Sequence, residues 1–131
     1  MFLLVIGCNS PLGLQSGTIK DSQISATCHQ YEIDLGGGHI ADAKPRSARL
    51  NANGAWCCYQ TRRSMHLTIN LEHVMNISGI ATQGIEGVLD YYVKMFSVYT
   101  SIDGTNWKAV YSDLNSTNQV TNASVVVQYY S

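Results

Sequence analysis

The sequence contains little charge. Asp, Glu, Lys and Arg make up 13% of its 131 residues, against about 25% in a typical soluble domain. Tyr, Asn, Ser, Thr and Gly take their place, and this mixture favours strands and turns over surface helices, which need Glu, Lys and Arg. No segment keeps a helical period, and no internal repeat is present. The composition therefore predicts one all-β domain with one core.

The lack of basic charge, of long apolar runs and of metal-binding or catalytic motifs reduces the number of possible functions. The formal net charge is −1 and no basic stripe is present, so we do not expect a nucleic-acid partner. No apolar run approaches the roughly 18 residues of a membrane span. Zinc-finger and EF-hand spacings are missing, as is a Ser-His-Asp or Cys-His grouping. We therefore expect a binding module that is not an enzyme and requires no cofactor.

The beginning of the chain allows two interpretations. Residues 1–6 are apolar, but the run is shorter than the ~7–15-residue core of a secretory signal and lacks a basic start. Residues 1–7 are therefore either the remnant of a signal or a first strand. Residues 8–131 form the single domain.

Alternation of apolar and polar residues predicts most of the strands. We expect strands at residues 22–27, 67–71, 77–82 and 125–130. Residues 31–45 contain three consecutive glycines and predict a long loop, which in a compact domain is usually functional. The two tryptophans, Trp56 and Trp107, are expected in the core.

A hairpin is the clearest local prediction. Between residues 92 and 107 apolar residues alternate with Lys94 and Ser97, and Asp103-Gly104 supplies residues that tolerate positive φ. Trp107 then opens the return strand, which extends to about Tyr111. This pattern is typical of a half-buried antiparallel hairpin and points to binding rather than catalysis.

The cysteines indicate an oxidising compartment. None belongs to a C-x-x-C motif. The adjacent Cys57 and Cys58 cannot easily bond to each other, because neighbouring side chains point to opposite faces of an extended chain. A disulfide role is the better interpretation. Sequons at Asn76, Asn115 and Asn122 agree with an extracellular glycoprotein.

An ordered set of motifs resembles the coagulation factor V/VIII type C, or discoidin, domain. The motifs occur in the family's order and at similar spacing over about residues 8–111. They are Cys8-Asn-Ser-Pro-Leu-Gly13, Ser16-Gly17 with Asp21-Ser-Gln-Ile-Ser-Ala26, Ala48-Arg-Leu-Asn51, Ala55-Trp56-Cys57, Leu67-Thr-Ile-Asn-Leu71, Gly79-Ile-Ala-Thr-Gln-Gly84 and the hairpin of residues 92–107.

The resemblance implies a galactose-binding-like jelly-roll β-sandwich. In this family three loops at one end contact ligands, which include phosphatidylserine membranes, glycans, collagen and other matrix or receptor proteins. It implies a module for cell adhesion or matrix recognition, extracellular and either secreted or on the cell surface as part of a larger protein. Carried onto this chain, the loops are residues 31–43, 59–64 and 85–90.

The same resemblance sets expectations for the cysteines and the end of the chain. The family pattern continues after Tyr111 and closes with a Gly-Cys whose cysteine pairs with the position of Cys8. Here it is absent, so we expect a truncated domain that lacks its last strands and leaves Cys8 without its partner. Cys28 would pair with Cys57 or Cys58 if the first two loops are neighbours. The alternative is that these thiols are free or intermolecular.

Candidate ligand contacts follow from the three loops. The candidates are Tyr31, Ile33, Leu35, His39 and Ile40 in the first loop, Tyr59, Arg62 and Arg63 in the second, and Ile85, Val88 and Leu89 in the third. Arg62 and Arg63 form either a cationic rim for acidic headgroups and sulfated glycans or a solvated loop. Val88 and Leu89 are either an exposed anchor or part of the core.

Acidic residues in the first loop bear on both the ligand and a metal. Glu32 and Asp34 would repel an anionic membrane, so we favour a glycan or protein ligand over phospholipid. With Asp42, they form a weak candidate for a structural calcium site. Two rival interpretations stay open, namely a carbohydrate-binding accessory domain of a larger hydrolase and a non-functional truncation product.

Overall fold

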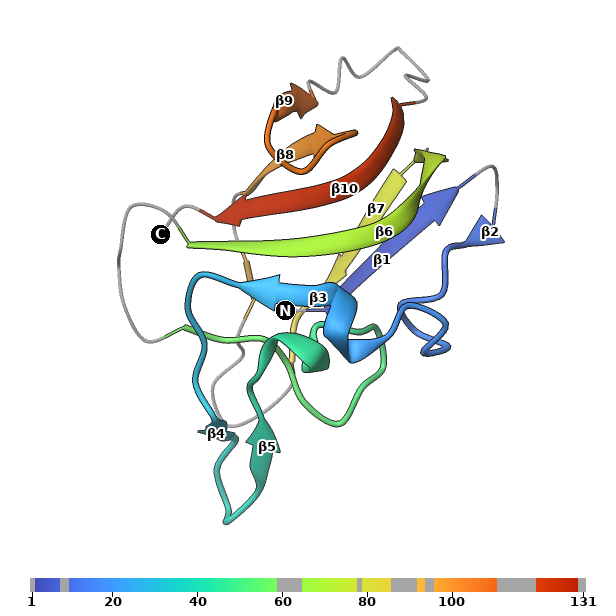
Figure 1. Ribbon diagram of the computed structural model, residues 1–131. Helices are drawn as coiled ribbons and strands as arrows, with labels where there is room; N and C mark the ends of the chain where they lie inside the picture. The colour runs from blue at the N-terminus through green and yellow to red at the C-terminus, as the bar shows by residue number, and fades with distance from the viewer. Residues whose placement is uncertain are drawn as a thin grey trace.

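The regular secondary structure of the protein is almost entirely β-strand (Figure 1). The computed structural model describes residues 2–7, 10–58, 65–77, 79–85, 92–93, 96–110 and 120–129. Within these ranges the helical elements are two short 3-10 turns, η1 (Asp21–Gln23) and η2 (Pro45–Ser47). None of the helical turns in this part of the chain is long and apolar enough to cross a membrane. The all-β prediction is confirmed.

The described strands form three antiparallel sheets. The largest has the order β3-β6-β10-β8-β9, a second has the order β2-β1-β7, and β4 pairs with β5 alone. The strands are β1 (Phe2–Gly7), β2 (Ser10–Pro11), β3 (Ile24–Ala26), β4 (Glu32–Asp34), β5 (Ile40–Asp42), β6 (Met65–Ile77), β7 (Gly79–Gln83), β8 (Phe96–Ser101), β9 (Lys108–Val110) and β10 (Val120–Tyr129).

The core lies on one face of the five-stranded sheet. Leu67, Ile69 and Leu71 of β6 are buried, as expected when every second side chain of a strand faces the interior. Ile24 of β3 pairs with Ile69, and Ile80 of β7 packs against the same cluster. Among the residues whose side chains the structure describes, this cluster, here called the sandwich core, contains Leu14, Ile19, Ile24, Ala48, Trp56, Leu67, Ile69, Leu71 and Ile77.

Most predicted strands are confirmed, with shifted boundaries. Residues 67–71 lie inside the longer β6, residues 77–82 overlap β7, and residues 125–130 overlap β10. Residues 22–27 contain η1 followed by β3. Residues 2–7 form β1.

The predicted hairpin is confirmed as β8 and β9. Gly104 has a φ of 74° in the turn, as expected. Asp103 accepts hydrogen bonds from the backbone N–H and side chain of Asn106, from Thr105 N and from Ser101 Oγ. These donors, Asn106 first, hold the pKa of Asp103 well below its usual range. The prediction that Trp107 fills the core is wrong, because its side chain stands in the exposed turn before β9; Trp56 is buried as predicted.

Strand β6 contains a bulge opposite β10. Asn70 pairs with Ser124 and Met75 pairs with Asn122, so four residues of β6 oppose one residue of β10. Glu72 within the bulge has a φ of 62°, and its N–H bonds to Asn70 Oδ1 at 2.9 Å. A bulge bends a strand and pins its register.

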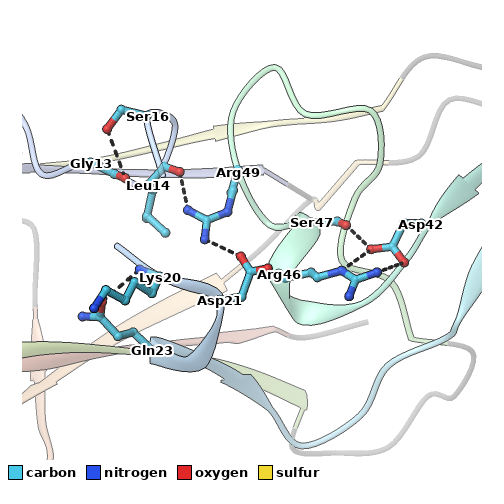
Figure 2. Close-up of polar contacts among 10 residues, drawn as sticks. All are labelled: Gly13, Leu14, Ser16, Lys20, Asp21, Gln23, Asp42, Arg46, Ser47 and Arg49. Atoms are coloured by element: carbon cyan, nitrogen blue, oxygen red, sulfur yellow. Dashed lines mark hydrogen bonds and ion pairs between the residues drawn. The ribbon is translucent and has the colours of Figure 1, made fainter. Parts of the chain in front are cut away.

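Arg49, whose side chain is only partly exposed, links the segment before β3 to the rest of the molecule. Arg49 donates to Leu14 O at 2.5 Å and to Asp21 Oδ1 at 2.7 Å (Figure 2). Its guanidinium presents several donors in a fixed plane, which suits two partners from different segments. The loop before β3 is therefore held against the η2 region.

Candidate functional site

The segment predicted as a long loop, residues 31–45, is a hairpin followed by a 3-10 turn. Ile33 pairs with Ala41, flanked by pairs of Glu32 with Asp42 and Asp34 with Ile40. The hairpin projects from the sandwich at the bottom of Figure 1. The loop prediction is wrong because each strand has only three residues, too few to show an alternating pattern.

Three glycines make the tight end of the hairpin. Gly36, Gly37 and Gly38 have φ values of 90°, 63° and 82°, a left-handed run that residues with a Cβ adopt only at a cost. Leu35 N–H bonds to His39 O at 2.8 Å, and His39 N–H bonds to Gly36 O at 3.1 Å. The glycine run is thus what allows the chain to reverse here.

The hairpin has a small core of its own. Ile33, Ala41 and Ala43 are buried together, and Leu35, Cys57 and Ile85 pack against them. We call this group the hairpin core. Ile33, predicted as a ligand contact, is instead a buried packing residue, because its side chain faces Ala41 and Ala43. Leu35 and Ile85 are only partly exposed for the same reason.

Backbone hydrogen bonds attach the β4–β5 hairpin to the rest of the domain. Ala43 N–H bonds to Tyr31 O at 3.1 Å and closes its base. Residues 54–58 then run beside β5, with Ala55 N–H on Asp42 O at 3.0 Å and Cys57 N–H on Ala43 O at 3.3 Å. Gly54 is required at this crossing, since a Cβ there would collide with the backbone carbonyl of Asp42.

A disulfide bond adds a covalent link near the base of the hairpin. Cys28 and Cys58 are bonded, with their Cα atoms 5.8 Å apart, which confirms that Cys28 pairs with one of the two adjacent cysteines. Trp56 Nε1 donates to Cys28 O at 2.7 Å beside the bond. Among the cysteines that the structure describes, Cys57 is free; burial against the hairpin core raises the pKa of its thiol.

Charged side chains gather where β5 ends. Asp42 accepts hydrogen bonds from Ser47 Oγ and from Arg46, whose Nε and Nη2 lie 3.3 Å from its oxygens (Figure 2). Lys44 Nζ lies 3.4 Å from Asp42 Oδ1. Burial alone raises the pKa of Asp42, but the hydrogen bond from Ser47 and the charges and hydrogen bonds of Arg46 and Lys44 outweigh it and lower the pKa.

The same contacts bear on the calcium expectation. Asp42 is engaged by Arg46, Lys44 and Ser47, and Asp34 Oδ1 accepts a hydrogen bond from Gly36 N–H at 2.7 Å. Over the ranges given above, no group of three His, Cys, Asp or Glu side chains is arranged to hold a metal ion.

Two predicted contacts stand exposed on the hairpin. The side chain of Tyr31 is 73% exposed and that of Ile40 is 59% exposed. His39, at the tight end, is exposed too. Tyr31 is positioned by two neighbours, because the His29 ring meets it edge-on with centroids 5.5 Å apart, and Lys44 Nζ lies 5.6 Å from its ring centroid.

His29 and Lys44 are absent from the candidates obtained from the sequence. Alternate residues of an extended chain share a face, so the spacing of His29 and Tyr31 is a signal for their contact. Lys44 carries no such signal, because it comes back to Tyr31 only through the reversal of the hairpin.

The remaining predicted residues are not tested by the geometry. Tyr59, Arg62, Arg63, Val88 and Leu89 lie outside the described residues, as do Cys8 and Asn115. Asn76 and Asn122 lie on the paired strands β6 and β10. The second loop and most of the third therefore stay predictions from the sequence.

Comparison with known proteins identifies the domain. The model of the F5/8 type C domain matches residues 23–130. Coagulation factor V of Pseudonaja textilis is 35% identical over 108 residues, which cover 79% of this chain and 7% of that protein. Coagulation factor VIII of Sus scrofa is 36% identical over 110 residues, which cover 81% of this chain and 5% of that protein.

A third relative is a subunit of a venom protein. The non-catalytic subunit of the venom prothrombin activator pseutarin-C from Pseudonaja textilis is 35% identical over 108 residues, or 79% of this chain and 7% of that protein. The chain thus spans less than a tenth of the length of these curated relatives. Because the family model and the relatives match about four fifths of a strand-rich, disulfide-bonded chain, the protein belongs to the F5/8 type C, or discoidin, domain family and is an extracellular module.

Proposed function

We propose that the domain is a non-enzymatic recognition module for cell adhesion or matrix binding, and that its β4–β5 hairpin contacts a glycan or protein ligand. F5/8 type C domains are ligand-binding modules. The observation that carries the proposal is a projecting hairpin (Figure 1). It has a packed base and leaves Tyr31 and Ile40 exposed.

Rigid support of the hairpin favours ligand binding by these exposed side chains. The hairpin core, the Tyr31–Ala43 closure and the Cys28–Cys58 bond hold the hairpin before a ligand arrives. A preorganised loop loses less conformational entropy on binding. Burying one large apolar side chain contributes about 1.5–3 kcal/mol, so contact with Tyr31 and Ile40 supports measurable affinity.

The charges on the hairpin favour some ligands over others. Glu32 and Asp34 are exposed on β4, and carboxylates oppose docking on an anionic bilayer. We therefore favour a glycan or protein over phospholipid. Arg62, Arg63, Val88 and Leu89 are proposed as further contacts on the second and third loops, on the strength of their sequence alone.

The test compares two isoleucines that differ only in location. Ile40→Ser alters the hairpin, and Ile102→Ser alters the β8–β9 turn, where the isoleucine is 65% exposed. Both proteins are screened with wild type on glycans, matrix proteins and phosphatidylserine vesicles. We expect Ile40→Ser to weaken the best ligand at least tenfold and Ile102→Ser to leave it unchanged. Equal binding by all three proteins would remove the hairpin from the site.

A further inference from the structure

The base of the β4–β5 hairpin carries a group of side chains that differs from its tip. Tyr31 presents most of its ring to solvent while His29 and Lys44 fix the ring's position. An aromatic ring held in this way offers a flat face to a ligand, and a sugar ring packs on such a face through its apolar C–H groups. The cation beside the ring adds a second, charged contact.

The cations at this base outnumber the carboxylate that they share. Lys44 and Arg46 both contact Asp42, which gives these three side chains a net positive charge. The side chain of Arg46 is 52% exposed, and those of Lys44 and Asp42 are 33% and 29% exposed, so both cations are accessible to a ligand. An ammonium has three donors and a guanidinium five, so N–H groups stay available after Asp42 is satisfied.

We infer that the base of the hairpin binds an acidic sugar residue, whose ring packs on Tyr31 and whose acid group accepts hydrogen bonds from Lys44 and Arg46. The inference rests on the proposed function and names the class of ligand. An acid group beside an ammonium and a guanidinium forms charge-assisted hydrogen bonds, which are among the stronger polar contacts in proteins. His29 serves as a positioning residue, because it holds the Tyr31 ring at its edge.

Nearby carboxylates define the size of this ligand. Glu32 pairs across the hairpin with Asp42, and Asp34 lies toward the glycine turn. A wide anionic surface would lie against these carboxylates as well as against the cations. A single acidic sugar needs to contact only Tyr31, Lys44 and Arg46. The arrangement therefore favours an acidic saccharide over an anionic membrane.

The experiment uses a hyaluronan hexasaccharide, whose glucuronate units carry carboxylates, and its carboxyl-reduced form, which is neutral. Binding is measured by calorimetry with the whole chain. We expect the acidic probe to bind at least tenfold more tightly than the neutral one, and Lys44→Gln and Arg46→Gln each to weaken it about tenfold. Equal binding of the two probes would overturn the inference.

Matched variants separate the site from effects on folding. Lys108→Gln removes an exposed lysine on β9, and Tyr92→Ala removes a tyrosine that is 63% exposed; both should bind like wild type. Tyr31→Ala should lose binding and Tyr31→Phe should keep it. Shifts of the His29 ring resonances on addition of the probe, in wild type but not in Tyr31→Ala, would place the ligand at the base. Unshifted resonances would contradict this.

The result also distinguishes the two proposals. If Ile40→Ser abolishes binding of some other ligand while neither hexasaccharide binds, the acidic-sugar site is wrong and the proposed function stands. If no hairpin variant changes the binding of any ligand, both are wrong.

Discussion

The sandwich core and the hairpin core are held together by different means. Over the described part of the chain, the sandwich core packs nine buried residues, among them leucines, isoleucines and Trp56. The hairpin core buries one isoleucine and two alanines. Each large aliphatic side chain contributes roughly 1.5–3 kcal/mol on burial and an alanine much less. The hairpin therefore depends on its backbone hydrogen bonds, its glycine turn and the disulfide.

The sandwich core therefore supplies most of the stability, whereas the hairpin carries the residues proposed for recognition. Proteins open locally where few apolar contacts hold a segment, and binding residues commonly sit on loops held by a rigid scaffold. In this domain the exposed Tyr31 and Ile40 stand on the part with the smaller core. The disulfide lies between the two parts, because Cys28 and Cys58 pack against the sandwich core while Cys57 packs against the hairpin core.

The same substitution in each core gives the largest expected effect and tests the comparison directly. Ile69→Ala should lower the free energy of unfolding by about 3–5 kcal/mol, because its site is closed on all sides. Ile33→Ala should cost about 2 kcal/mol, since the hairpin can partly collapse. Urea denaturation gives both values, with the exposed Val74→Ala as control. Equal costs for the two isoleucines would show that the cores do not differ.

Removal of the disulfide comes next in size. Replacing Cys28 and Cys58 together by serine opens a loop with a sequence separation of 30, which should cost about 3–4 kcal/mol in the chain-entropy model. Hydrogen exchange should show faster exchange at Ala43 N–H than at the β6 amides, relative to wild type. Uniform acceleration of exchange would contradict a role specific to the hairpin.

A glycine in the tight turn should have a smaller effect. Gly37→Ala places a Cβ on a residue with a φ of 63°, and the left-handed conformation costs about 1 kcal/mol for an L-residue. Gly79→Ala is the control, because a Cβ there meets no neighbouring atom and its φ is not positive. We expect ligand affinity to fall only in Gly37→Ala. The same loss in both variants would mean that turn geometry is not the cause.

The smallest effect concerns pH. The folded pKa of Asp42 lies below its ordinary value of 3.8, so its contribution to stability is fully present above that value and is lost as the pH falls through the lowered pKa. Exchange at Ala43 N–H should therefore accelerate below about pH 4, after correction for the intrinsic rate. Asp42→Asn should remove this dependence, and an unchanged profile in that variant would exclude Asp42 as the cause.

Long alternating segments could be predicted from the sequence, and short ones could not. The apolar–polar pattern around Leu67 identifies β6, and Asp103-Gly104 identifies the β8–β9 turn, because both signals lie within a few neighbouring residues. The hairpin at residues 31–45 was missed because its pairing depends on three-residue strands and on contacts with residues 54–58. Contacts between segments distant in the sequence determine the structure of this hairpin, and they also determine the exposure of Trp107.

The candidate site shows the same limit. Tyr31 and Ile40 follow from the family's first loop and are exposed as expected. Ile33 could not be separated from them in the sequence, because the face that each strand presents is set by the register of β4 against β5. The choice of Cys58 over Cys57 likewise depends on which side chain faces Cys28 after folding.

The position of β10 has a consequence for biosynthesis. It is the last strand of the described chain, yet it lies between β6 and β8 in the large sheet. A ribosome must therefore deliver residues 120–129 before the β8–β9 hairpin can join β6. Until then β6 and β8 each have an open edge, and open edges recruit other chains. The strands are synthesised in one order and pair in another. The yield of monomeric protein therefore depends on how the open edges of β6 and β8 are protected while the chain emerges.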